Sequence, residues 1–364
     1  MNISDFKVRF SSIVDIGEKI SLLERETNDK YLKLHRGVMD VSTIDLGFID
    51  LNLNDKETHQ YSNNDGDINL IQSIKSIFGL NDHHVIICPG GMPSLDIVIN
   101  SLSDEIAWIP EYHWGSWNKI LETHGFRDSG DRIIRTFNEF DLESFRPIEG
   151  IVMLCYPSNP TGWMPEMSIL DRFIRYCYQM DITVILDLPY YHMFFDSDSI
   201  SNLFLKNVIV VSSFSKSVGL SGYRIGYVAT LNYDLYGVLR TRSLYKYNSI
   251  SNLPQRIINK LISTEIGQVS VSKYRNDTKD EIVKNIKYLK KNDLLWDKYP
   301  KDPIGPFCIV KNSFDELLSY KISSVPLNKF TIDSSLEMGV SRISLAVNND
   351  RFISYFDKIL DNLK

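Results

Sequence analysis

The sequence predicts an α/β fold, with a large domain built on a mostly parallel sheet and a second, smaller α+β domain. Two apolar runs, Gly150–Tyr156 and Ile182–Leu186, flank a segment with helical spacing at Met167–Met180. This strand–helix–strand pattern is typical of two parallel strands that lie close together. From about Asn248 the pattern changes, which predicts the second domain. There we expect helices at residues 250–264, 270–296 and 350–363, and strands at Phe307–Lys311 and Ser341–Val347.

Composition and charge argue against several classes of protein. The chain has 364 residues, of which 43% are hydrophobic, and this suits roughly two domains with a sizeable core. Its net charge of −6, with both signs interspersed, argues against nucleic acid as a main partner. No apolar run approaches the ~18 residues that a membrane helix needs, and the first ten residues lack the apolar centre of a signal peptide. We therefore expect a cytoplasmic protein that does not sit in a membrane.

The four cysteines are scattered and do not form a CxxC pair; they are Cys88, Cys155, Cys177 and Cys308. All four fall in apolar segments that read as strands or helices. We therefore expect buried thiols rather than disulfides or metal ligands, and we predict no metal site.

The chain begins with a predicted helix and a short strand. Residues 4–30 look amphipathic, with one apolar face formed by Phe6, Phe10, Ile13, Ile20 and Leu23. Leu32 and Leu34 then alternate as in a strand, which stops at Gly37.

Two glycines separate the next predicted strand from the next helix. The strand is Val85–Cys88, and the helix begins after Gly90 and Gly91 and runs to about Leu102. Glycines before a helix leave backbone N–H groups free to bind an anion, and the helix dipole adds to the attraction. Gly-Gly alone is weak evidence, so this segment predicts a phosphate site only in combination with other residues.

Polar residues follow three of the predicted parallel strands. Asn159 comes after the first strand, Asp187 ends the second, and Lys216 follows the strand Val208–Val211. Nearly equal numbers of residues separate these three positions, as in a repeated crossover unit. Because parallel strands end at the same edge of a sheet, where open α/β folds bind ligands, we expect the three side chains to lie together.

The segment around Lys216 reads as a polar turn between two strands, and it has the residues of a phosphate site beside an amine. Ser213 lies three residues before the lysine and Arg224 eight residues after it, with glycines at positions 219, 222 and 226. Hydroxyl groups and a guanidinium bind phosphate, and a buried lysine can act as a nucleophile. A lone lysine after a strand is usually a solvated charge. The prediction of a phosphate site beside a reactive amine therefore depends on the serine, the arginine and the glycines near Lys216.

The run from Ser213 to Lys216, followed by Gly222-Tyr-Arg224-Ile-Gly226, resembles the lysine region of class I/II aminotransferases, the fold-type I pyridoxal phosphate enzymes. The resemblance implies a sheet of the seven-stranded type and a Schiff base between Lys216 and pyridoxal 5′-phosphate. It also implies that Ser213, Ser215 and Arg224 grip the cofactor phosphate. We divide the chain into an N-terminal arm that is part of the small domain (1–45), a large cofactor-binding domain (46–247) and a small C-terminal domain (248–364).

Further segments resemble the family in the same order along the chain. The resemblance implies that Gly90, Gly91 and Met92 contact the phosphate, that Asn159 and Tyr190 donate to the ring oxygen, and that Asp187 pairs with the ring nitrogen. It also implies that Gly37, Asn159 and Arg342 bind the substrate, with Arg342 on its α-carboxylate. Tyr61 would reach the phosphate of the other subunit in a homodimer. The cofactor ring would stack on Trp114, with Tyr112 as the rival residue.

Two positions depart from the family pattern. Ile71 stands where many members have arginine, and Met92 stands where a hydroxyl residue is common. One phosphate bond must therefore come from the backbone or from Ser94.

Taken together, the sequence predicts an aminotransferase that moves an amino group between an amino acid and a 2-oxo acid. A decarboxylase or a β-eliminating lyase on the same fold is the alternative, because such enzymes share the cofactor residues. A non-enzymatic sensor domain of a transcription regulator is disfavoured, since the first ~45 residues offer no helix-turn-helix. The substrate stays open, and the candidates for contacting its side chain are His35, Arg36, Trp117 and Arg135.

Overall fold

The computed structural model describes residues 11–196, 198–333, 335 and 339–362. Within these residues the central sheet has eight strands in the order β2-β9-β8-β7-β6-β3-β5-β4. Their bounds are β2 His84–Cys88, β3 Ile106–Pro110, β4 Phe126–Arg127, β5 Arg132–Phe137, β6 Ile151–Cys155, β7 Thr183–Asp187, β8 Val208–Ser213 and β9 Gly226–Thr230. Only β9 pairs in antiparallel fashion, with β2 and with β8. The predicted mostly parallel sheet is confirmed, and β4 adds a two-residue strand at one edge of the expected seven.

Both faces of this sheet are covered. Along β6, Ile151 and Met153 pack into one apolar cluster, while Val152 and Leu154 pack into another. The first cluster includes buried residues of α4 (Gly91–Ser101) and α5 (Gly115–Thr123), and the second those of α3 (Ile68–Ile77) and α6 (Met167–Gln179). Burial on both faces explains why these strands read as continuous apolar runs rather than as alternating ones.

The lysine segment lies between β8 and β9. It was expected to be a polar turn, but residues Phe214–Ser217 form the short helix α9, followed by the 3-10 turn η2 at Ser221–Tyr223. A Cβ at Gly226 would lie 2.7 Å from the backbone of Gly90, so glycine at position 226 lets the two segments approach each other. Lys216 is thereby carried on an ordered turn beside the start of α4.

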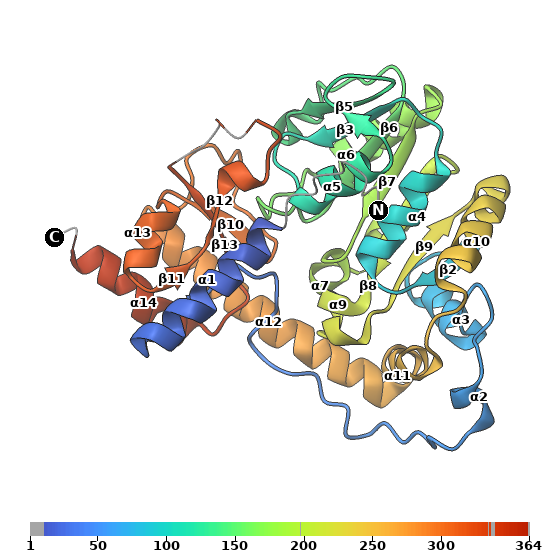
Figure 1. Cartoon of the computed structure of the whole chain (residues 1–364), viewed down its shortest axis with the longest axis horizontal. Helices are drawn as coiled ribbons and strands as arrows, with labels where there is room; N and C mark the ends of the chain where they lie inside the picture. The colour runs from blue at the N-terminus through green and yellow to red at the C-terminus, as the bar shows by residue number, and fades with distance from the viewer. Residues whose placement is uncertain (1–10, 197, 334, 336–338, 363–364) are drawn as a thin grey trace, which may run out of the picture.

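The residues from α11 (Asn252–Ser263) onward contain a second, smaller sheet and several helices. They include the long helix α12 (Glu265–Lys291) and a three-stranded antiparallel sheet in the order β10-β13-β12. The other elements are β10 Phe307–Val310, α13 Phe314–Ser319, β11 Ile322–Ser323, β12 Val325–Pro326, η3 Leu327–Lys329, β13 Ser341–Ser344 and α14 Asn349–Asp361. Figure 1 shows this sheet beside the central one, with α12 running between the two parts.

The N-terminal segment packs against the C-terminal part. Helix α1 covers Ser12–Thr27 and ends before the predicted residue 30, because Asn28 adopts a left-handed conformation. The predicted apolar residues Phe6 and Phe10 lie outside the described residues. Strand β1 (Leu32–Lys33) pairs in parallel with β11. This pairing supports the assignment of the arm to the small domain, while the domain boundaries stay a prediction.

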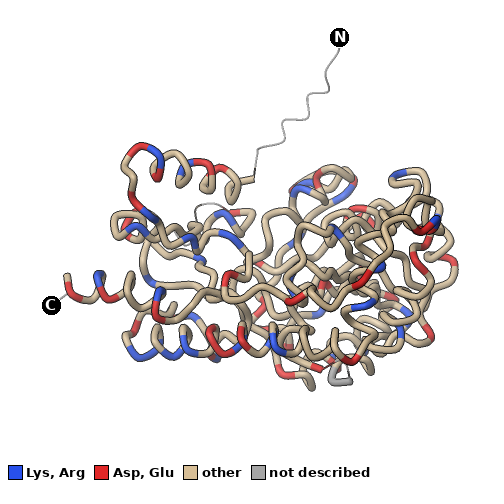
Figure 2. The backbone as a smooth tube through the Cα atoms, turned by 90° about the horizontal axis from the view of Figure 1, so that it is seen from below, with Lys and Arg blue, Asp and Glu red and all other residues tan. Residues whose placement is uncertain are grey.

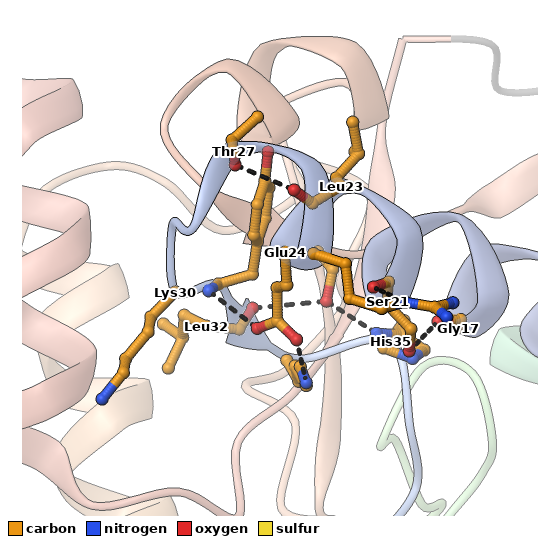
Figure 3. A network of polar contacts seen from close by, with 12 residues as sticks. Gly17, Ser21, Leu23, Glu24, Thr27, Lys30, Leu32 and His35 are labelled. Atoms are coloured by element: carbon orange, nitrogen blue, oxygen red, sulfur yellow. Dashed lines mark hydrogen bonds and ion pairs between the residues drawn. The ribbon is translucent and has the colours of Figure 1, made fainter.

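Polar contacts fasten the arm in place (Figure 3). The carboxylate of Glu24 accepts from the backbone N–H of Tyr31, and the hydroxyl of Ser323 donates to the carbonyl of Leu32 at 3.3 Å. The same hydroxyl lies 2.6 Å from Nδ1 of His35, which is buried. The backbone that follows β1 is therefore held at a fixed distance from β11.

The remaining elements are short connections and one longer helix: α2 Lys56–His59, η1 Glu139–Asp141, α7 Tyr191–Phe194, α8 Asp198–Ser201 and α10 Tyr233–Tyr247. Figure 2 shows that basic and acidic residues are interspersed over the described backbone. Among the described residues, none of the helices has both the length and the apolar character that crossing a membrane requires. The four cysteines are free and buried.

Candidate active site

Three neighbouring strands deliver the predicted polar residues to one cavity. β6, β7 and β8 are parallel, and their register places Cys155 beside Asp187 and Asp187 beside Val211. Asn159, Asp187 and Lys216 follow these strand ends and line a cavity of about 240 Å³. The predicted site residues that line it are Gly91, Met92, Trp114, Asn159, Asp187, Tyr190, Ser213, Ser215, Lys216 and Arg224.

Four predicted site residues do not line this cavity. A Cβ at Gly90 would lie 2.5 Å from the guanidinium of the lining residue Arg224, and the charge of Arg342 acts on Lys216. Gly37 accepts a hydrogen bond from Nζ of Lys216 through its carbonyl oxygen. Tyr61 is 83% exposed and lies outside the cavity of its own chain.

One end of the cavity is a cradle for an anion. Gly90 caps α4 with φ at 107°, and a Cβ there would lie 2.5 Å from Nη2 of Arg224. A Cβ at Gly91 would contact the Ser213 side chain at 3.7 Å. Arg224 itself has a left-handed backbone (φ 57°), and its Nη1 donates to the carbonyl of Ser221 at 2.8 Å. Within the described part of the chain no carboxylate pairs with Arg224, so the helix start and the guanidinium offer positive charge to a phosphate.

Asp187 is the acid at the floor of the cavity. It is 4% exposed, and burial raises the pKa of its carboxyl group to about 7. The indole Nε1 of Trp117 donates to its Oδ2 at 3.2 Å, which opposes that rise. A buried carboxylate with one neutral donor is costly to ionise, so the site favours a positively charged partner.

Lys216 is the candidate nucleophile. Burial, followed by the charges of Arg342 and Arg224, lowers the pKa of its ammonium group from 10.5 to about 8. A substantial fraction of the amine is therefore neutral near physiological pH, as a nucleophile requires.

Asn159 and Tyr190 converge from two loops. Nδ2 of Asn159 donates to the Tyr190 hydroxyl at 3.4 Å, and both side chains are buried. Oδ1 of Asn159 is buried without a hydrogen-bond partner. Burial also raises the pKa of the Tyr190 phenol, so the hydroxyl remains a donor. The pair can donate to an oxygen atom placed in the cavity.

Arg342 lies on β13, and its charge acts on Lys216. Its guanidinium is 1% exposed and packs over the rings of Phe307, at 4.5 Å, and Phe330, at 5.1 Å. Nη2 donates to the carbonyl of His35, whereas Nε is buried without a partner. Burial lowers the pKa of the guanidinium to about 10, so it stays charged at neutral pH. No described carboxylate pairs with it, and a substrate carboxylate is the natural partner.

The structure also separates the two rival aromatic residues. Trp114 lines the cavity, whereas Tyr112 is buried elsewhere and packs edge-on against Trp296 at 5.5 Å. Trp114 also borders a second cavity of about 560 Å³, which shares Met92 with the first and has Phe330 in its wall. None of the four candidates for contacting a substrate side chain (His35, Arg36, Trp117, Arg135) lines either cavity.

Some lining residues were not anticipated from the sequence: Leu95, Cys155, Pro189 and Ser221. Ser221 lies in the lysine loop, and its polar side chain between two glycines was an available signal. Leu95 and Cys155 are core residues by type, and nothing in their local sequence marks them. Trp117 was considered only for substrate contact, although its place three residues after Trp114 was a signal that both serve one site.

The residues present fit the pyridoxal phosphate that the sequence resemblance implies. Two cationic residues, Lys216 and Arg224, line the cavity together with the carboxylate of Asp187, and the charge of Arg342 also acts on Lys216. Arg224 and the start of α4 suit a phosphate, Asp187 suits a protonated ring nitrogen, and the amide N–H groups of Asn159 and the Tyr190 hydroxyl are donors for a ring oxygen. An apolar ligand would leave these groups unpaired.

Comparison with known proteins points the same way. The family model for aminotransferase class I and II matches residues 42–351. A histidinol-phosphate aminotransferase of Macrococcus caseolyticus is 27% identical over 191 residues, which is 50% of this chain and 50% of that protein. An LL-diaminopimelate aminotransferase of Bacteroides thetaiotaomicron is 32% identical over 131 residues, or 32% of each chain. The matches thus span half the length of these curated relatives or less.

Solved structures show the same fold over the whole chain. A Methanococcus jannaschii protein, described as similar in its active site to kynurenine aminotransferases, has a TM-score of 0.81 at 18% identity and is covered over 100% of both chains. The aspartate aminotransferase of Thermus thermophilus with maleate has a TM-score of 0.81 at 16% identity over 99% of both chains.

The family match extends over most of the sequence and includes the three strand ends and the C-terminal arginine. Class I and II aminotransferases use pyridoxal phosphate, which confirms the cofactor expected from the residues around Lys216. The resemblance of the Lys216 segment to class I/II aminotransferases is confirmed, and the chain belongs to the class I and II aminotransferase family.

Proposed function

We propose that this protein is an aminotransferase that moves an amino group between an amino acid and a 2-oxo acid, with Lys216 as its central residue. One observation carries the proposal: an amine whose pKa is lowered to about 8 shares a cavity with Asp187 and Arg224, and it feels the charge of the buried guanidinium of Arg342, whose Nε has no hydrogen-bond partner. A dianionic cofactor and a substrate carboxylate satisfy the two arginines, and the amine is placed to act on the substrate.

The residues would hold the cofactor as follows. Arg224, Ser213, Ser215 and the backbone of Gly90, Gly91 and Met92 would bind the phosphate, and Trp114 would pack against the ring. Asp187 would keep a proton on the ring nitrogen, while Asn159 and Tyr190 would donate to the ring oxygen. When bound, pyridoxal phosphate supplies an electron-poor ring that accepts the electrons of the substrate's Cα–H bond.

The remaining chemistry belongs to two side chains. Nζ of Lys216 would take the proton from the substrate Cα and return it at the other end of the conjugated system, which requires the neutral amine. Arg342 would bind the α-carboxylate together with Gly37 and Asn159 and so fix the direction of the Cα–H bond. We propose that the substrate side chain extends past Trp114 into the cavity of about 560 Å³.

We also propose that the enzyme is a homodimer in which Tyr61 of one subunit completes the phosphate site of the other. Tyr61 is 83% exposed, and Arg224 is exposed in the single chain. An exposed aromatic residue and an exposed phosphate-binding arginine are both explained by a second subunit. Sedimentation velocity measures the oligomeric state. A protein that sediments only as a monomer at micromolar concentration would refute the proposed homodimer. A cytoplasmic location stays a prediction from the sequence.

The test of the reaction type is spectroscopic. Purified protein with bound cofactor is mixed with each member of a panel of amino acids, and the visible absorbance is followed. We expect at least one amino acid to convert the cofactor from its aldehyde form to its amine form, and an added 2-oxo acid to reverse the change. Release of carbon dioxide or ammonia without this interconversion would identify a decarboxylase or an eliminating lyase instead.

The lowered pKa of Lys216 predicts a pH dependence. Loading of the cofactor-free protein needs the neutral amine, whose fraction rises as pH approaches the pKa and then levels off. We expect the rate of loading to rise with pH, to reach half its maximum near pH 8 and to level off above it. Absorbance after stopped-flow mixing measures the rate, with Nα-acetyl-lysine as the control, whose rate keeps rising towards its ordinary pKa of ~10.4. A protein rate that also keeps rising beyond pH 9 contradicts the prediction.

A further inference from the structure

The carboxylate of Asp187 accepts a hydrogen bond from a side chain of α5. Nε1 of Trp117 lies 3.2 Å from Oδ2 of Asp187, and both side chains are buried, with Trp117 at 1% exposure. Among the residues that the structure describes, no other group donates to this carboxylate and no cation pairs with it. Its orientation in the cavity is therefore set by one indole N–H.

The contact leaves the second oxygen of the carboxylate for a ligand. Trp117 bonds Oδ2 alone, and Asp187 lines the cavity that also holds Lys216. The cost of a buried carboxylate falls when it accepts hydrogen bonds. The indole thus stabilises the ionised form of Asp187 before any ligand arrives, without supplying a charge that would compete with the ligand for it.

Tryptophan can only donate in this hydrogen bond, and Asp187 can only accept. Indole Nε1–H is a donor only, and it does not titrate in the range where proteins are folded. A histidine at this position could donate, accept or become charged. With tryptophan, Oδ2 is an acceptor at every pH, so a proton shared between Asp187 and a ligand must lie at Oδ1.

The same helix also supplies the aromatic wall. Trp114 is the N-cap of α5 and lines the cavity, and Trp117 follows three residues later within α5. Trp117 belongs to the apolar cluster between α5 and the sheet that contains Ile120, Leu121 and Ile185. The packing that anchors α5 therefore fixes both the ring wall and the donor to Asp187.

We propose that Trp117 is a positioning residue of the active site, whose indole N–H holds Oδ2 of Asp187 so that Oδ1 is presented to the ring nitrogen of the cofactor. This inference rests on the proposed function, since it assigns Trp117 to the residue that pairs with that nitrogen.

The test compares Trp117→Phe with the matched variant Trp108→Phe. Trp108, on β3, also donates through Nε1, at 3.0 Å, but to the backbone carbonyl of Glu149, and it does not line the cavity. Cofactor affinity is measured by titrating cofactor-free protein with pyridoxal phosphate and following absorbance. We expect the Kd of Trp117→Phe to rise by roughly tenfold or more, because a hydrogen bond to a charged group is lost, and that of Trp108→Phe to stay unchanged.

A second readout follows the pH titration of the bound cofactor. A positive charge on the ring nitrogen opposes protonation at the Lys216 nitrogen. If Asp187 holds that charge less firmly, Lys216 nitrogen protonates at higher pH, so the midpoint of the absorbance change in Trp117→Phe should move upward by up to ~1 pH unit. A lower unfolding temperature with an unchanged Kd and an unchanged midpoint would show a purely structural role and overturn the proposal.

Two further outcomes are informative. If Trp117→Phe does not fold, the same measurements are made on Trp117→His at about pH 8, where the imidazole is neutral and keeps one N–H donor: a Kd close to that of the natural protein supports the proposal, and a loss of tenfold or more overturns it. Neither readout depends on turnover. A protein that binds the cofactor with these changes but converts no amino acid would refute the proposed transamination while leaving the role of Trp117 intact.

Discussion

Replacement of Lys216 with alanine is expected to lower the rate of amino-group transfer by about 10³-fold or more. The side chain supplies the nucleophile that binds the cofactor and the base that moves the proton at the substrate Cα, and a positioned base alone contributes 10²- to 10⁴-fold. Lys216→Arg should be equally inactive although it keeps the positive charge, because a guanidinium does not give up its proton in proteins. The measurement is kcat in a coupled assay for the 2-oxo acid product.

The control for this prediction is Lys273→Ala. Lys273 lies on α12 with a side chain that is 75% exposed and paired with Asp277, so its removal should leave kcat within a factor of two, as expected for a surface ion pair. Borohydride reduction of the loaded protein followed by peptide mapping provides an independent check. A label on any lysine other than Lys216, or substantial turnover by Lys216→Ala, would contradict the assignment.

The parts of the site that follow strand ends were predictable from the sequence. Parallel strands of similar length end at one edge of a sheet. Asn159 and Asp187 follow or end two apolar runs, so the sequence predicts that they lie together, and both line the cavity. The glycines ahead of α4 were predictable for a similar reason, because a helix start with free N–H groups is a local feature.

The remaining parts depend on contacts between segments far apart in the sequence. The approach of Gly37 to Lys216, and of His35 to Arg342, is set by the pairing of β1 with β11, which no local pattern specifies. The contact between Trp117 and Asp187 likewise joins α5 to β7 through the core. The short helix α9 was read as a turn because four residues are too few to show helical spacing.

Arg342 is the second residue whose replacement should have a large effect. Its guanidinium is buried and has no carboxylate partner among the described residues, and its Nε has no hydrogen bond at all. We expect Arg342→Gln to lower kcat/KM for an amino acid roughly 10²- to 10³-fold, because truncating one partner of a buried, hydrogen-bonded ion pair costs several kcal/mol, ~2–5. The cofactor residues are untouched, so the Kd for pyridoxal phosphate should change little.

The discriminating measurement uses an amine that has the same side chain but lacks the α-carboxylate. If Arg342 binds that carboxylate, the amine should react slowly with the natural protein and at nearly the same rate with Arg342→Gln. The substitution should then lower the rate for the amino acid alone. Arg351→Gln is the matched control. Arg351 is half-exposed and forms a long ion pair of 3.7 Å with Asp40, so the kcat/KM of this variant should be unchanged. Equal losses for the amine and the amino acid would show that Arg342 supports the fold of the pocket instead of the substrate, because a carboxylate-binding group cannot stabilise a molecule that has no carboxylate.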